Sequence, residues 1–146
     1  MKIDHDALVM VVDGGKMLLF RNEGDAVHPH LLVENATENA NPPDREQGTD
    51  APGRTSSSVG SGRSAMSETN FHDQQESRFV VDAVDLLNRR ALASEYEHLI
   101  IVAPPAVLGE MRKHYHKVLE ARLVGEIGKD LTGHTAPDIE RAITQH

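Results

Sequence analysis

Short apolar runs in the N-terminal part of the chain predict three β-strands. Residues 7–12 read Ala-Leu-Val-Met-Val-Val, and a second apolar run covers residues 17–20. The Asp-Gly-Gly-Lys sequence between them is typical of a β-hairpin, because glycine adopts positive φ at no steric cost. A third strand is expected at residues 30–38, between Pro29 and an Asn-Pro-Pro sequence.

The apolar spacing then changes to that of a helix. Between residues 72 and 95 one face carries five apolar side chains at helical spacing, while most charged residues fall elsewhere. These five are Val80, Ala83, Val84, Leu87 and Ala91. The wholly apolar run that starts at Leu99 and ends at two prolines predicts a strand buried on both faces.

The rest of the chain predicts two further helices and one strand. A helix is expected over residues 106–121, a fifth strand over 122–131, and a last helix within 135–145, with Thr135 as its N-cap. The predicted order is β-β-β-α-β-α-β-α. This order is that of an α/β protein in which a mixed five-stranded sheet carries three helices, and we expect a single domain over residues 1–146.

The segment between the third strand and the first helix, residues 41–71, contains almost no residues that could form a core. Loops of this length are usually functional or disordered, so we expect a flexible loop. Its basic residues are balanced by neighbouring acids, which argues against a general electrostatic arm. Recognition by specific hydrogen bonds would fit the sequence better, since arginine suits phosphate or carboxylate groups.

The overall charge limits the kinds of partner. The 146 residues carry 23 acidic against 15 basic side chains, a formal net charge of −8, and no cysteine. Thiolate metal sites and disulfides are therefore excluded, and a general polyanion binder is disfavoured because phosphate affinity depends on Lys and Arg. No segment approaches the about 20 apolar residues of a membrane span, so we expect none. We also expect a cytoplasmic protein without a DNA partner.

Five blocks of the sequence resemble the host attachment protein family of bacteria, and together they cover essentially the whole chain. They are "VMVVDGGKMLLFRNEGD", "NPPDREQGTDAPGR", "RFVVDAVDLLNRRA", "LIIVAPPAVLGEMRKHYHKVL" and "VGEIGKDLTGHT". This family is considered a bacterial relative of the middle domain of the archaeal and eukaryotic class-one release factor. The resemblance implies an RNase H-like fold, which agrees with the element order.

In the release-factor domain the loop after the third strand carries a Gly-Gly-Gln motif that assists hydrolysis of peptidyl-tRNA. Gly-Gly-Gln occurs nowhere in this sequence, and Gln47-Gly48 is among its nearest elements. No hydrolytic role is therefore carried over to any residue. The favoured function is a non-catalytic binding module for the ribosome, tRNA or other RNA. The alternatives are a surface attachment factor for host cells and a peptidyl-tRNA hydrolase-like rescue factor.

Two groups of residues are candidates for binding. The first lies in the loop and consists of Arg45, Gln47, Gly48, Arg54 and Arg63. The second is a basic cluster on the predicted 106–121 helix, where residues four apart would form two adjacent rows: Arg112 with His116, and Lys113 with Lys117. An ordinary solvated helix face is the alternative interpretation of the second group.

Metal and nucleophile chemistry find little support in the sequence. His28 and His30 have no evident third ligand nearby, and His114 and His116 would point in different directions on a helix. Asp13 is interpreted as a turn residue of the predicted hairpin. We expect no metal and no other cofactor.

Overall fold

The computed structural model describes the backbone at residues 1–39 and 61–146, and the side chains at residues 1–39 and 74–146. Its centre is a five-stranded sheet in the order β3-β2-β1-β4-β5. The strands are β1 Leu8–Val12, β2 Lys16–Asn22, β3 Leu31–Glu38, β4 Leu99–Val102 and β5 Leu123–Ile127. The described helices are α3 Ser61–Leu92, α4 Pro105–Arg112, α5 Lys117–Arg122 and α6 Ala136–Thr144.

The sheet is mixed, because β2 runs against its neighbours. β1 pairs antiparallel with β2, and β2 pairs antiparallel with β3. β1 also pairs parallel with β4, and β4 pairs parallel with β5. The predicted α/β class, with a mixed five-stranded sheet and a long segment between the third strand and the first described helix, is confirmed. The structure describes four helices where the sequence predicted three.

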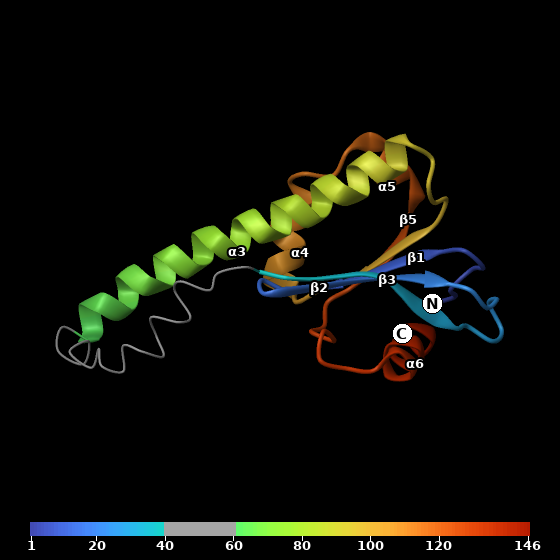
Figure 1. Ribbon diagram of the computed structural model, residues 1–146, viewed down its shortest axis with the longest axis horizontal. Helices are drawn as coiled ribbons and strands as arrows, with labels where there is room; N and C mark the ends of the chain where they lie inside the picture. Colours follow the sequence, from blue (N-terminus) through green and yellow to red (C-terminus); the bar gives the residue numbers. More distant parts are fainter. Residues whose placement is uncertain (40–60) are drawn as a thin grey trace.

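Helices cover both faces of the sheet, with α3, α4 and α5 on one side and α6 on the other (Figure 1). All five residues of β1 are buried. Met10 packs with Leu87 of α3 in one core, whereas Val9 packs with Ile139 of α6 in the other. This two-sided burial explains the continuous apolar sequence of β1, and the same holds for β4.

The turn between β1 and β2 is closed by a side chain. Asp13 Oδ1 accepts the backbone N–H groups of Gly15 and Lys16, both at 2.7 Å. No glycine in the described residues has positive φ, so the expected glycine-dependent turn is not the one observed. The interpretation of Asp13 as a turn residue is confirmed, because its carboxylate accepts two N–H groups of the turn while its own N–H donates to the Lys16 carbonyl at 3.0 Å.

Helix α3 begins at Ser61, well before the expected start near residue 72. The prediction of a loop over 41–71 was therefore wrong for its last part. Once the core holds the later turns of a helix, each earlier residue adds a backbone hydrogen bond without needing burial. Figure 1 shows the first turns of α3 extending beyond the sheet. Its 32 residues correspond to about 48 Å of helix.

The single helix predicted over residues 106–121 is two helices. α4 ends at Arg112 and α5 begins at Lys117, with a turn over residues 113–116 between them. The turn contains neither Gly nor Pro, so the local sequence carried no signal for it. The predicted strand over 122–131 is shorter as well, and β5 follows directly after α5. The N-cap at Thr135 is confirmed, since its hydroxyl accepts the Asp138 N–H at 3.3 Å.

Candidate binding site at the turn between helices α4 and α5

The four basic-cluster residues surround the turn between α4 and α5 instead of forming rows on one helix. Arg112 is the last residue of α4, and Lys113 is its C-cap. His116 is the N-cap of α5, where its Nδ1 accepts the Val118 N–H at 3.1 Å. Lys117 is the first residue of α5. The predicted i, i+4 rows were therefore wrong, because the helix direction changes between them.

The structure does not describe the side chains of the five loop candidates. Arg45, Gln47, Gly48 and Arg54 lie outside the described residues. The backbone of Arg63 belongs to the first turn of α3, and its side chain lies outside the description. Their binding role stays a prediction.

Helix α3 holds the turn in place through Asn88. The Asn88 side-chain NH₂ group donates to the His114 carbonyl at 3.0 Å, and its Oδ1 accepts the His116 N–H at 3.0 Å. One amide thus satisfies a backbone donor and a backbone acceptor that the interruption of the helix leaves free. This contact fixes the position of the four candidate residues relative to the sheet.

Glu126 of β5 is the centre of a polar network that sequence reasoning missed. Its Oε1 accepts Arg112 Nε at 2.9 Å and Arg112 Nη2 at 2.7 Å, while its Oε2 accepts the Tyr115 hydroxyl at 2.6 Å. The Glu126 side chain is 17% exposed. A lone acid in the apolar sequence Leu-Val-Gly-Glu-Ile was the available signal, since a charged group on a strand facing helices needs partners.

Two opposing effects set the protonation of this network. Burial raises the pKa of the Glu126 carboxyl, but the hydrogen bonds from Arg112 and Tyr115 outweigh burial, and the pKa lies below its usual value. Burial and the neighbouring Glu126 both raise the pKa of the Tyr115 hydroxyl. Near neutral pH the site therefore holds a carboxylate, a guanidinium and a neutral phenol.

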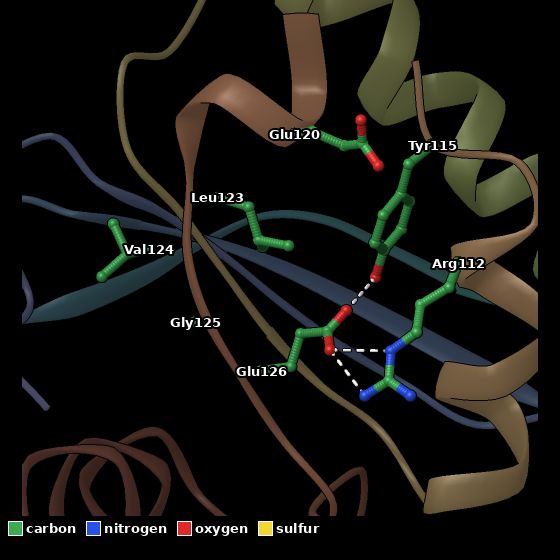
Figure 2. Close-up of a pocket in the computed structure, with 7 residues that line it drawn as sticks. All are labelled: Arg112, Tyr115, Glu120, Leu123, Val124, Gly125 and Glu126. Carbon is green, nitrogen blue, oxygen red and sulfur yellow. Dashed lines mark hydrogen bonds and ion pairs between the residues drawn. The ribbon is translucent and has the colours of Figure 1, made fainter. Parts of the chain in front are cut away.

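An open depression of about 510 Å³ lies beside β5, above this network (Figure 2). Its lining comes from the end of α4, the turn, α5 and the edge strand. The residues are Arg112, Tyr115, Glu120, Leu123, Val124, Gly125 and Glu126. The depression thus combines one cation, two acids and an apolar wall.

Most of the cationic groups around the turn are already paired. Arg112 is bound to Glu126, and Lys113 Nζ lies 3.4 Å from Glu110 Oε1. His114 also approaches Glu110, and its hydrogen bond is the main cause that lowers the pKa of that carboxyl. Within the described part of the chain, Lys117 has no such partner. The turn therefore offers few free positive charges.

The turn that follows β1 shows no metal-binding arrangement among the described residues. Asp13 Oδ2 accepts the Thr132 hydroxyl at 2.8 Å, and the same hydroxyl contacts Asp130 Oδ1 at 2.9 Å. Both Asp13 oxygens therefore have protein partners. Across residues 1–39 and 74–146, no group of three His, Cys, Asp or Glu side chains is placed to hold a metal ion.

The strand order and the helices on both faces define the chain as an α/β protein. Comparison with protein families matches residues 6–143 to bacterial archaeo-eukaryotic release factor family 12. The chain belongs to this family. No curated protein matches the sequence. The relationship to release factors is confirmed, whereas the host attachment name is not.

The match runs from the start of β1 to the last turn of α6, so it includes every strand of the sheet. Membership in a release-factor family suggests a role related to translation. None of the helices, as far as the structure describes them, is long and apolar enough to cross a lipid bilayer.

Proposed function

We propose that this protein is a ribosome-associated binding protein that acts in translation without hydrolysing peptidyl-tRNA. The observation that carries the proposal is the family match over residues 6–143, which covers the sheet and all described helices. The partner in this proposal is the ribosome or a tRNA bound to it. The alternative of a surface attachment factor has no supporting observation in the fold or the site.

The two elements that flank residues 39–60, called here the connecting segment, support a recognition role for it. β3, an edge strand of the sheet, ends at Glu38, and α3 begins at Ser61. Among the side chains described in α3, Phe79 is the first that packs against the core. The first turns of α3 extend beyond the sheet, as Figure 1 shows.

The residue types in that segment suit binding better than catalysis. Its sequence contains Arg45 and Arg54, which can form paired hydrogen bonds with phosphate groups. Gln47 is preceded by Glu46 and followed by a single glycine, so the two glycines that would bring a backbone close to an ester are missing. Recognition without ester hydrolysis is the function that this composition favours.

The turn between α4 and α5 supplies a second, smaller contribution. Lys113 is 69% exposed and Lys117 is exposed, so both amines can approach a phosphate. Arg112 is held by Glu126 and would have to exchange that carboxylate for a phosphate. We therefore assign the larger share of RNA binding to the connecting segment.

Ribosome co-sedimentation tests the proposal. We expect the full-length protein to sediment with ribosomes at low salt, and to dissociate as salt is raised because phosphate contacts release counterions. The triple variant Arg45→Ala, Arg54→Ala, Arg63→Ala should lose most of this association. The matched control Lys2→Ala, Lys129→Ala, Arg141→Ala removes the same charge elsewhere and should retain it.

Two results would overturn the proposal. One is no association of the intact protein with ribosomes or tRNA at low salt. The other is an equal loss in both triple variants, which would indicate only a general effect of charge. A hydrolase role is tested separately with a model peptidyl-tRNA. Turnover by the intact protein that disappears on deleting residues 47–63 would replace our proposal with the rescue-factor alternative.

A further inference from the structure

We infer that the open edge of β5, together with the depression beside it, binds an extended peptide segment of another protein, with a Lys or Arg side chain of that peptide directed at Glu120. This inference goes beyond the proposed function and does not depend on ribosome association. Its basis is the position of β5 in the sheet, the shape beside it and the charges that line that shape.

The main chain of β5 has an unpaired side. β5 is the last strand of the sheet and pairs only with β4. The Ile127 carbonyl accepts the Ala103 N–H at 3.0 Å, so the backbone of Ile127 faces β4. Because consecutive residues of a strand alternate, the N–H and C=O of Glu126 face the open side. An extended peptide beside β5 would find a donor and an acceptor there.

The two sheet edges differ. At the start of β3 the Leu31 N–H is already taken by Glu140 of α6, at 2.7 Å. Most of β3 is exposed. β5 has the depression of about 510 Å³ along it, and Val124 on this edge is 45% exposed. β5 therefore combines free main-chain groups with space for a partner side chain.

The charges in the depression favour a basic side chain. Arg112 and Glu126 neutralise one another through two hydrogen bonds, and Tyr115 occupies the second oxygen of Glu126. Glu120 is exposed and has no hydrogen bond or ion pair from its carboxylate within the described part of the chain. The lining therefore has a net negative charge, located at Glu120.

The same charges disfavour other ligands. A phosphate group would meet the unpaired carboxylate of Glu120, and the only lining cation is engaged with Glu126. Leu123 and Val124 form an apolar wall that the aliphatic part of a Lys or Arg side chain can cover while its charged end reaches Glu120. A basic extended peptide satisfies the main chain, the wall and the charge together.

An NMR titration of the full-length, ¹⁵N-labelled protein tests this inference. The probe is an eight-residue peptide of alternating Thr and Lys with blocked ends, and the comparison peptide has Glu in place of Lys. We expect the Lys peptide to shift the amide signals of Val124 and Glu126 saturably and the Glu peptide to leave them unchanged. A Lys peptide N-methylated at alternate residues should bind at least about tenfold more weakly, because it cannot pair with a strand edge.

Two charge-reversal variants separate this site from a general effect of net charge. Glu120→Lys should weaken Lys-peptide binding by about tenfold, and Glu120→Gln by less. Glu38→Lys makes the same charge change on β3, the other edge, and should leave binding near the wild-type value. The amide spectrum away from α5 reports whether each variant is folded.

Three outcomes would overturn the inference. They are an unchanged β5 signal at millimolar peptide, equal binding of the Lys and Glu peptides, and equal weakening by Glu120→Lys and Glu38→Lys. Full binding of the N-methylated peptide would overturn the strand-pairing part. Failure of ribosome association would leave each of these results unaffected, so the two proposals are tested independently.

Discussion

The side-chain oxygen of Asn88 accepts the backbone N–H of His116 at 3.0 Å, from a position 28 residues earlier in the chain. The same side chain donates to the His114 carbonyl at 3.0 Å. α3 thereby sets the place where one helix stops and the next begins. The position of Lys113 and Lys117 depends on this amide, although neither residue contacts it in the structure.

Replacing Asn88 with Ala should destabilise the protein by roughly 1–3 kcal/mol, because it removes two hydrogen bonds to backbone groups of the turn. Urea denaturation followed by circular dichroism measures this change. Asn35→Ala on the exposed strand β3 is the control and should change stability by less than about 0.5 kcal/mol. Equal stabilities of the Asn88 variant and the wild type would show that the turn holds without the amide.

The protonation of Glu126 should respond to its two partners in a defined direction. The hydrogen bonds from Arg112 and Tyr115 keep the pKa of this carboxyl below its usual value against the effect of burial. In Arg112→Ala and in Tyr115→Phe, burial acts with less opposition, so the pKa of Glu126 should rise in both. A ¹³C NMR titration of the glutamate carboxyls measures the pKa directly. A Glu126 pKa unchanged from wild type in both variants would contradict the network.

Stability at acid pH should depend on Glu34 of β3. Burial raises the pKa of this carboxyl, but hydrogen bonds from Arg21 and Arg90 outweigh it and the pKa is lowered overall. In the unfolded chain a Glu takes up its proton near pH 4.3, whereas folded Glu34, with its lowered pKa, takes up its proton at lower pH. The unfolded state then binds more protons, so stability is lost as pH falls from about 5 through the folded-state pKa.

Glu34→Gln should therefore cost about 1 kcal/mol at pH 7, and the difference from wild type should shrink toward acid pH. Urea denaturation midpoints between pH 7 and pH 3 provide the measurement. Glu38→Gln removes the same charge from β3 without touching Arg21 or Arg90, and its stability should follow the wild-type curve. A constant difference for Glu34→Gln over this range would refute the assigned linkage.

Substituting Gly24 and Gly125 compares two kinds of crowding: an added Cβ would meet backbone atoms at Gly24 and the end of a flexible side chain at Gly125. A Cβ atom on Gly24 would lie 2.1 Å from the His28 carbonyl oxygen and 2.9 Å from the His30 nitrogen, both of them backbone atoms. A Cβ on Gly125 would lie 2.6 Å from Met1 Cε, the flexible end of a side chain. Gly24→Ala should destabilise by at least about 2 kcal/mol, and Gly125→Ala by less than about 1 kcal/mol. Thermal denaturation of the two variants compares them.

The elements with a strong local pattern were predictable. β1 and β4 are buried on both faces, so their sequences are continuously apolar, and the stripe from Val80 to Ala91 specifies the inward face of α3. Thr135 caps α6 through an atom three residues away, which is also a local signal. The start of α3 could not be placed in this way, since residues with no apolar periodicity join a helix that its later turns already stabilise.

The contacts of the candidate site could not be predicted from the sequence. The basic residues from Arg112 to Lys117 were visible in the sequence, but their partners come from distant positions: Asn88 on α3 and Glu126 on β5. Composition and spacing describe neighbours along the chain. They predict which apolar side chains are buried, because the hydrophobic effect is non-directional and requires no specific partner. Which acid neutralises Arg112, and which amide interrupts a helix that local propensity would continue, depend on directional bonds that exist only after the sheet and helices have assembled.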